Sequence, residues 1–120
     1  MKFAYEKLEV WNKAVNFAVQ VIDAVGKDEL DRKHYRLVEQ IEASSASVAA
    51  NIAEGKGRIS RKEFVRFLYI SRGSLYETMT FLEIYKRKGW IEEADFNRIE
   101  NLGIEVASMI KGLINSISND

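Results

Sequence analysis

The segment Ser47-Val-Ala-Ala-Asn-Ile-Ala-Glu-Gly-Lys-Gly57, continued two residues later by Ser60-Arg-Lys-Glu-Phe64, is the stretch that decides the fold. It begins with small and apolar residues, places Asn51 and Glu54 three positions apart, and ends in two glycines and a group of cations. Small residues allow another backbone to approach a helix closely, and glycine beside a cation is typical of a helix end. The segment therefore predicts a corner between two closely packed helices.

The composition of the chain indicates one all-α domain that covers residues 1–120. The chain is 47% hydrophobic, which is enough for a single core, and it contains no proline and no cysteine. Its 18 basic residues are balanced by 18 acidic ones, so it lacks the cationic excess on which general polyanion binding depends. Without cysteine there are no disulfides and no thiolate metal sites, and no stretch has the length of a membrane span. We expect a cytoplasmic protein without a membrane partner.

Apolar residues that recur at spacings of three and four predict four helices. Their expected ranges are about 5–25, from Asp31 or Arg32 to about 55, about 61–88, and from about 92 onward. Ser60 and Glu63 form a capping box before the third helix, and a glycine at position 89 follows its last cations. Because the connections are short, consecutive helices should be antiparallel. The predicted fold is an antiparallel up-down-up-down four-helix bundle.

Two elements carry more apolar residues than one core face needs. The first helix has an apolar stripe from Leu8 to Val25 and a second stripe beside it, so it is either central in the bundle or has a neighbour on its outer side. On the third helix, six large side chains lie partly outside the core stripe: Tyr69, Tyr76, Phe81, Ile84, Tyr85 and Trp90. A solvated monomer should not show so much apolar surface. We therefore predict self-association, with these interface candidates: Val10, Phe17, Tyr69, Tyr76 and Phe81.

An aromatic platform for single-stranded nucleic acid would have a similar composition, but it would need cations interleaved on the same face. No such cations are evident from the sequence, which favours a protein–protein interface over a nucleic-acid platform on this helix.

No residue pattern indicates a reaction. His34 is the single histidine and follows Asp31 by three positions, which supplies at most one of the two Glu-x-x-His pairs that a di-iron bundle needs. The Gly55-Lys-Gly57 sequence follows a helix and not a strand, so it is interpreted as a helix stop and not as a phosphate loop. We expect no catalytic residue, no metal and no cofactor, and we predict that the chain is not an enzyme.

Polar residues at the border of the predicted core need partners. Ser47, Asn51, Glu54 and Arg58 fall on one stripe of the second helix, beside its apolar stripe. We predict a structural polar lock to the third helix, through Ser74, Glu77 or Arg72, and assign it these residues: Ser47, Asn51, Glu54, Ser74 and Glu77. The alternative is a contact with a ligand or partner at the end of the bundle.

The corner between the second and third helices holds five cations near a single acid, Glu63. They are candidate nucleic-acid contacts: Lys56, Arg58, Arg61, Lys62 and Arg66. Phosphate contacts need no more than such a local cluster, although a cluster of this kind is also typical of a solvated corner. Residues 86–88 form a second cluster about 30 Å away by helix rise, so only oligomerisation could join the two.

The residues quoted above resemble those of the bacterial four-helix-bundle family first described as intervening-sequence proteins of 23S ribosomal RNA. Residues 47–55 are similar to its S-I-P-x-N-I-A-E-G signature, and residues 8–14 are similar to its opening L-x-V-W-x-x-A pattern. Gly73-Ser74-Leu75 and Gly89-Trp90-Ile91 resemble its third helix and the turn that follows. The chain departs from the pattern in two ways: Ala49 stands in place of a proline, and Glu42-Ala43 stands in place of paired arginines.

The resemblance implies an antiparallel bundle that assembles into a homopentameric ring and has no catalytic residues. It also implies a relation to the accessory variability determinant of diversity-generating retroelements, a pentamer whose basic surface engages a reverse transcriptase and nucleic acid. We expect a non-enzymatic oligomeric scaffold or accessory protein. The alternative is an RNA- or DNA-binding accessory protein that uses the basic patches of a homopentameric ring, and another protein stays open as a partner.

Overall fold

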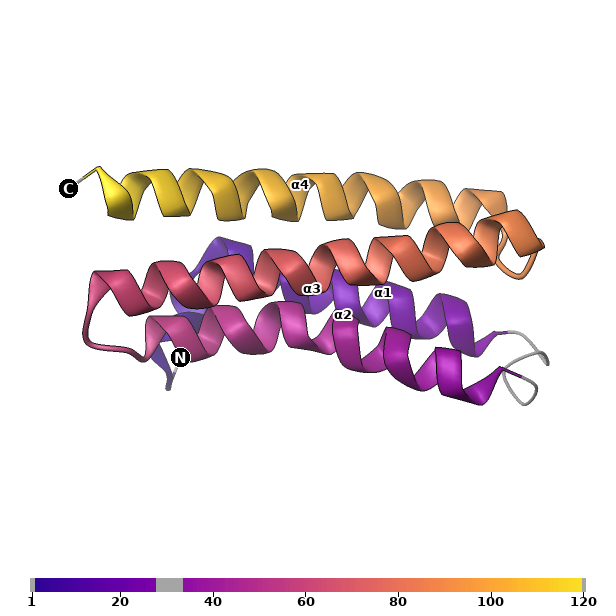
Figure 1. Ribbon diagram of the computed structural model, residues 1–120, viewed down its shortest axis with the longest axis horizontal. Helices are drawn as coiled ribbons and strands as arrows, with labels where there is room; N and C mark the ends of the chain where they lie inside the picture. The colour runs from indigo at the N-terminus through magenta and orange to yellow at the C-terminus, as the bar shows by residue number, and fades with distance from the viewer. Residues whose placement is uncertain (1, 28–33, 120) are drawn as a thin grey trace.

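Four long helices lie side by side in alternating directions in the computed structural model, which describes residues 2–27 and 34–119 (Figure 1). A 3₁₀ helix, η1 (Ala4–Lys7), precedes α1 (Glu9–Gly26), α2 (Tyr35–Lys56), α3 (Arg61–Lys88) and α4 (Glu93–Ser118). The molecule measures 47 × 23 × 22 Å, and the described ranges contain no strand. The predicted all-α, up-down-up-down four-helix bundle is confirmed.

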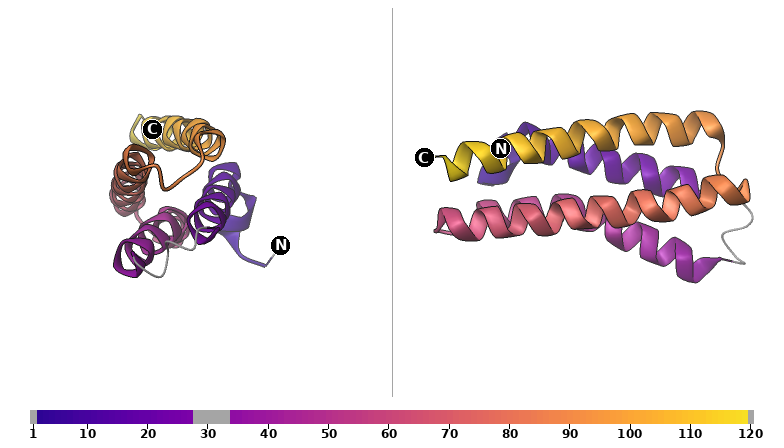
Figure 2. Two further views of the ribbon diagram at one scale, coloured as in Figure 1. Left: turned by 90° about the vertical axis from the view of Figure 1, so that its right-hand side faces the viewer. Right: turned by 45° about the horizontal axis from the view of Figure 1, so that its top comes forward.

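The four helices close into a four-sided bundle. Viewed along the axis, α1 packs between α2 and α4, and α3 completes the square on the opposite side (Figure 2). The most extensive contact joins α2 to α3, the two helices that the corner segment connects. The core runs along the axis and receives side chains from all four helices.

Helix α1 begins later than predicted. Leu8 is extended (φ −79°, ψ 120°) and separates η1 from α1, so the chain is not one continuous helix from Tyr5. The carboxylate of Glu6 accepts hydrogen bonds of 2.7 Å from the backbone N–H groups of Lys2 and Phe3, which stabilises η1 as a separate turn. The apolar spacing continues across this break, which is why periodicity alone did not reveal it.

The structure tests the predicted start of α3 but not the predicted start of α2. The predicted start of the second helix near Asp31 or Arg32 lies outside the described residues, and described helix α2 begins at Tyr35. At the start of α3, Ser60 Oγ accepts a hydrogen bond of 3.0 Å from the N–H of Glu63, as the capping box predicts. The carboxylate of Glu63 instead pairs with Arg66, so the reciprocal half of the box is replaced by an ion pair.

Helix α3 ends at the predicted glycine. Gly89 has φ +73°, a left-handed conformation that favours glycine. Its N–H donates to the carbonyl of Lys86 at 3.0 Å, and the N–H of Trp90 donates to the carbonyl of Tyr85 at 2.9 Å. These bonds satisfy carbonyls of the last helical turn and turn the chain toward α4.

The buried side of α1 includes the second apolar stripe and part of the first. Val10, Phe17 and Val21 are buried, and Phe17 has no exposed area. The first stripe is only partly buried at Leu8, Trp11, Val15 and Ile22. Because α1 packs between α2 and α4, it needs apolar residues across both stripes. Val10 and Phe17 are therefore inside the chain and present no surface to a partner, which corrects their assignment to an oligomer interface.

Candidate functional site

Hydroxyl groups form a polar seam between α2 and α3. Within the described residues, Ser44 Oγ and Thr78 Oγ1 are hydrogen-bonded at 2.7 Å, and Ser47 Oγ and Ser74 Oγ at 2.9 Å. Next to the second pair, toward the α2–α3 turn, Ser71 Oγ donates to the carbonyl of Val48 at 2.7 Å. Short hydroxyl side chains can pair across a contact only where two helices are very close. The small residues of the corner segment thus serve a tight contact that hydrogen bonds hold in register.

The predicted polar lock is only partly assembled across the two helices. Ser47 and Ser74 meet in the seam, whereas Asn51 bonds within α2. Its Nδ2 donates to the carbonyl of Ser47 at 2.9 Å and to Ser47 Oγ at 2.8 Å. Asn51 therefore orients the Ser47 hydroxyl and does not itself cross to α3.

The two carboxylates assigned to the lock do not join it. Glu54 forms an ion pair of 2.6 Å with Arg58, one turn later on the same side of the corner. Glu77 is exposed, and it lines a shallow groove of about 250 Å³ together with Ser47 and Ser74. Sequence spacing gave Glu54 the position expected of a lock residue. It could not show that Arg58 would form an ion pair with Glu54 instead.

Gly55 lies at the closest approach of α2 to α3. A Cβ atom at this position would be 2.8 Å from Phe67 Cβ and 3.0 Å from Phe64 Cδ1. It would also be 3.2 Å from the carbonyl oxygen of Phe64. Real Cβ atoms do not come within 3.0 Å of another side chain's Cβ, so only glycine fits here without a shift of α3. The glycine of the corner segment therefore sets the geometry of the helix pair.

Two arginines at the corner are engaged with carboxylates and with one aromatic ring. The guanidinium carbons of Arg58 and Arg66 lie 4.9 Å and 4.5 Å from the centre of the Phe67 ring. Arg58 also pairs with Glu54 at 2.6 Å and Arg66 with Glu63 at 2.9 Å. The hydrogen bond from Arg66 lowers the pKa of the Glu63 carboxyl, with added effect from nearby cations.

The other three cations proposed as nucleic-acid contacts lie around the same turn. The Lys56 ammonium is 5.9 Å from the centre of the Phe64 ring. Arg61 and Lys62 line a shallow groove of about 340 Å³ against the end of α4, beside Ile117. The corner is therefore a mixed surface, in which the carboxylates of α2 and α3 balance part of its positive charge.

The outer side of α3 carries an exposed apolar row. Tyr69, Ile70, Tyr76 and Ile84 each expose at least 40% of their area. The guanidinium carbon of Arg72 lies 4.8 Å from the centre of the Tyr69 ring and 5.7 Å from that of Tyr76. A cation is thus interleaved with the two tyrosines, contrary to the expectation that none would be. The i, i+3, i+7 spacing of residues 69, 72 and 76 was the available signal.

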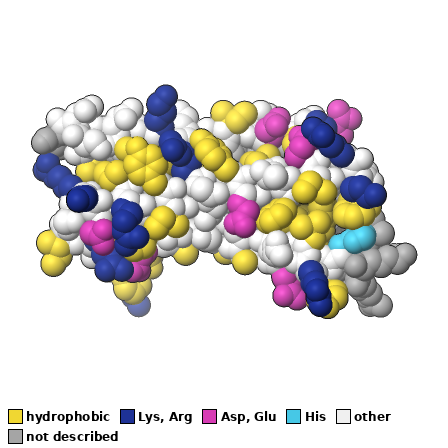
Figure 3. Space-filling model, in the orientation of Figure 1, with side chains coloured by type: hydrophobic (Ala, Val, Ile, Leu, Met, Phe, Trp, Pro, Cys, Tyr) yellow, Lys and Arg dark blue, Asp and Glu magenta, His cyan; other side chains and the backbone are white. Residues whose placement is uncertain are grey.

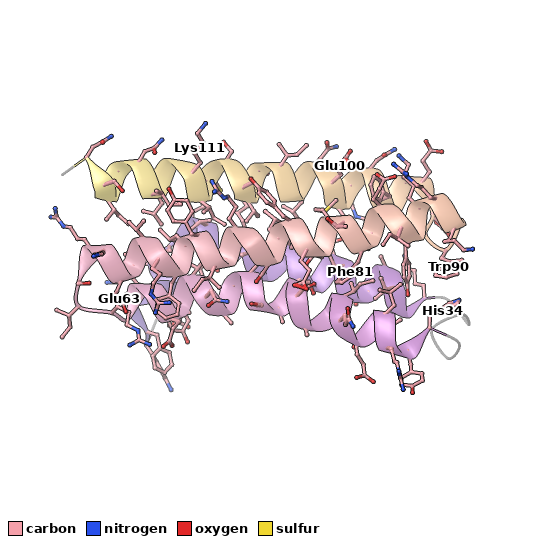
Figure 4. The ribbon with its side chains drawn as sticks, in the orientation of Figure 1. His34, Glu63, Phe81, Trp90, Glu100 and Lys111 are labelled. Atoms are coloured by element: carbon pink, nitrogen blue, oxygen red, sulfur yellow. The ribbon has the colours of Figure 1, made fainter. Side chains whose placement is uncertain are left out.

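The C-terminal end of α3 holds an aromatic cluster that includes the single histidine. The rings of His34 and Trp90 are stacked with their centres 3.7 Å apart, and Tyr85 meets Trp90 edge-on at 5.3 Å (Figure 4). Tyr85 is buried, which corrects its placement outside the core stripe, and Phe81 is partly buried against the core. In the space-filling view, an apolar patch lies beside His34 on the visible face of the molecule (Figure 3). His34 therefore packs against an aromatic ring.

A groove of about 480 Å³ lies between α3 and α4. Met79, Ile84 and Phe96 give it apolar walls, and Glu83 and Glu100 add carboxylates. Glu83 pairs with Arg87 at 3.0 Å, whereas no side chain in the described ranges pairs with Glu100. Arg87 lines the groove as well, so its guanidinium offsets the charge of Glu83 there.

Two features are absent from residues 2–27 and 34–119. No group of three or more His, Cys, Asp or Glu residues in these ranges could hold a metal ion. None of the helices there has both the length and the apolar character needed to cross a membrane.

Two comparisons with known proteins match most of the chain. The family model described as 23S rRNA-intervening sequence protein matches residues 6–112. The chain belongs to the 23S rRNA-intervening sequence protein family. A comparison with curated proteins gives no match.

The chain also resembles a solved structure. This member is similar to the crystal structure of a protein of unknown function from the S23 ribosomal protein family of Bacteroides thetaiotaomicron. The two share 27% sequence identity with a TM-score of 0.79, over 88% of this chain and 97% of the other. The fold of the 23S rRNA-intervening sequence protein family thus extends over nearly the whole chain.

Proposed function

We propose that this member of the 23S rRNA-intervening sequence protein family is a non-enzymatic scaffold or accessory protein that assembles with copies of itself in the cytoplasm. The observation that carries the proposal is the exposed row of Tyr69, Ile70, Tyr76 and Ile84 on α3. Exposed apolar patches of this kind mark interaction sites, because burial against a partner removes them from water. The lack of cysteine suits a reducing compartment.

The interior of the bundle supports a scaffold better than an enzyme. Every buried side-chain nitrogen or oxygen in the described part of the chain has a hydrogen-bond partner. Ser44, Ser71 and Thr78, which are buried polar residues, all take part in the seam between α2 and α3. Active sites usually hold polar groups in perturbed environments, and these hydroxyls serve helix packing instead.

The number of copies in the proposed assembly follows from the resemblance, which implies a homopentameric ring. Closed rings are a common outcome when one surface of a chain binds a different surface of the next copy. The relation to the accessory variability determinant of diversity-generating retroelements is part of the same proposal.

Light scattering on a size-exclusion column tests the proposal. The wild-type chain should have a mass that is a multiple of 13.8 kDa, fivefold for a pentamer. The double variant Tyr69→Ser, Tyr76→Ser should shift toward the monomer. The matched control Tyr35→Ser, which alters an equally exposed tyrosine on α2, should keep the wild-type mass. A wild-type monomer at every concentration would contradict the proposal.

A second candidate function is RNA or DNA binding by an accessory protein, and one observation favours it. Arg72 lies between the rings of Tyr69 and Tyr76, an arrangement of the kind that stacks on bases of a single strand. The pairing of Arg58 and Arg66 with carboxylates weighs against the corner as the main phosphate contact. A titration with a single-stranded oligonucleotide at increasing salt tests this candidate, which predicts steep salt dependence and weaker binding by Arg72→Ala.

A further inference from the structure

Helix α1 carries an apolar strip that its own chain covers only in part. The strip consists of four residues: Trp11, Val15, Val19 and Ile22. Val19 exposes 48% of its area, and the other three are half-buried. From Val10 to Ile22 the sequence has a single charged residue, Lys13, which pairs with Glu105 on α4. A helix that is apolar over so much of its circumference is expected to have neighbours on more than one side.

The strip lies on the flank of α1 that faces away from α4. Lys13 pairs with Glu105 at 2.6 Å, and Gln20 accepts a hydrogen bond of 2.9 Å from Arg98, so positions 13 and 20 mark the flank toward α4. Positions 11 and 22 are each two residues from these, which at about 100° per residue places them on the other flank. The strip and the exposed row on α3 therefore occupy different sides of the bundle, and one copy can offer both at once.

We propose that the exposed row on α3 of one copy packs side by side along the α1 strip of the next copy. This contact rests on the self-association proposed above and names the second surface that takes part in it. One long side of the bundle, 47 by 22 Å, has roughly 1,000 Å², and a stable interface needs about 800 Å² from each partner. Because row and strip differ, a fixed rotation from each copy to the next closes a ring.

The row and the strip match in position along the bundle. A Cβ atom at Gly103 would lie 3.2 Å from Phe17 and within 3.6 Å of both Leu75 and Met79, so these side chains of α1 and α3 are at one level. The two helices run in the same direction (Figure 1), so each residue of α1 is level with a residue about 60 positions later on α3. The row is thus level with residues 9–24, which contain the whole strip. Copies around an axis parallel to their bundles share one height, so the contact needs no shift.

The charges beside the row and the strip are complementary at one end. Arg72 contacts tyrosine rings and pairs with no carboxylate in residues 2–27 and 34–119, and Glu9 forms no ion pair there either. By level the two differ by three positions, about 4.5 Å, which an arginine side chain spans. Arg66 and Arg87 are already paired with carboxylates of α3. Glu77 lies on the other side of the row, in the groove toward α2.

Gly73 makes room for a partner helix in the middle of the row. It is exposed, lies between Tyr69 and Tyr76 along α3, and a Cβ atom there would meet nothing within 4 Å. Glycine inside a helix lowers stability relative to alanine, and no described neighbour in its own chain requires it here. It allows close approach of another helix, and its level falls between Trp11 and Val15 of the strip. Large side chains of the strip thus meet a recess in the row.

Cysteine cross-linking tests the contact directly, because the natural chain contains no cysteine. The double variant Val19→Cys, Thr80→Cys carries two exposed cysteines that the proposal places at nearly one level on adjacent copies. The two sites cannot join within one chain, because α1 and α3 stand at opposite corners of the bundle (Figure 2). Mild oxidation should therefore give a ladder of linked copies that ends at the number of copies in the ring.

The matched control is Val19→Cys, Ile70→Cys, whose second cysteine is also in the row. Its level is nine residues from that of Val19, roughly 13 Å, which a disulfide does not span. This control should give no ladder. Equal ladders from the two variants, or only dimers or monomers from Val19→Cys, Thr80→Cys, would overturn the proposal.

Sedimentation of Val19→Asp separates this contact from self-association in general. A carboxylate in the apolar contact should weaken association about 10- to 100-fold. The matched control Asn16→Asp places the same charge on the flank of α1 toward α4, and it should associate like wild type. An oligomeric wild type with an unchanged Val19→Asp variant refutes this contact alone. A monomeric wild type refutes the contact and the proposed function together.

Discussion

Replacing Gly55 by alanine should destabilise the protein, although alanine is the better helix former. The added Cβ atom would lie 2.8 Å from Phe67 Cβ and 3.2 Å from the carbonyl oxygen of Phe64. Neither atom is the end of a flexible side chain, so α3 must move away from α2. Overpacking of this kind costs about 1–3 kcal/mol, and the gain in helix propensity offsets up to about 1 kcal/mol. We expect a net loss of about 1–2 kcal/mol in the free energy of unfolding.

Thermal unfolding followed by circular dichroism measures this effect. At a fixed protein concentration, the net loss corresponds to a midpoint lower by about 4–8 °C for a domain of this size. The matched control is Gly112→Ala on α4, away from the exposed row on α3, where a Cβ atom would meet nothing within 4 Å. This control should gain about 0.5–1 kcal/mol in stability, because alanine restricts the unfolded chain. The reasoning is refuted if Gly55→Ala is as stable as wild type while Gly112→Ala is stabilised.

Three further changes test other contacts of the bundle. Gly103→Ala should cost less than Gly55→Ala in the same thermal assay, because its Cβ would lie 3.2 Å from the ring of Phe17, whose edge can shift slightly. Ser71→Ala should lower the free energy of unfolding by about 1 kcal/mol in a urea titration, through loss of the 2.7 Å bond to the carbonyl of Val48; an unchanged midpoint would contradict a stabilising seam. The pKa of Glu63 is lowered in the folded protein, so its ion pair with Arg66 stabilises the protein above the ordinary pKa of 4.5 and that benefit is lost as the pH falls below it. The stability difference between wild type and Glu63→Gln should therefore shrink on acidification, and a difference that grew would have the wrong sign.

The four-helix architecture could be predicted because the patterns that indicate it are local in the sequence and recur along the chain. Apolar periodicity indicated the four helices. Gly89 marked the end of α3 by its left-handed backbone, and Ser60 marked the start by its side-chain acceptor. Periodicity could not say which of two adjacent stripes on α1 faces inward, since that depends on where α2 and α4 pack. Val10 and Phe17 were assigned to the surface for this reason, and the structure buries them.

The candidate surfaces were harder to predict, because they depend on which of several partners a side chain selects. Glu54 had the right position for a lock to α3, yet Arg58 lies one turn away and takes its carboxylate. Arg72 was considered as a partner for that lock and instead lies over Tyr69 and Tyr76. When a long flexible side chain has several possible partners within reach, the tertiary structure decides which of them it contacts.

Native mass spectrometry of the unmodified chain tests self-association, the central claim, most directly. The account predicts a dominant species whose mass is a multiple of 13.8 kDa, fivefold for the proposed pentamer, with little free monomer. The intensity of this oligomeric species should fall in the Tyr69→Ser, Tyr76→Ser variant. A spectrum that contains only the 13.8 kDa chain at every concentration would contradict the account.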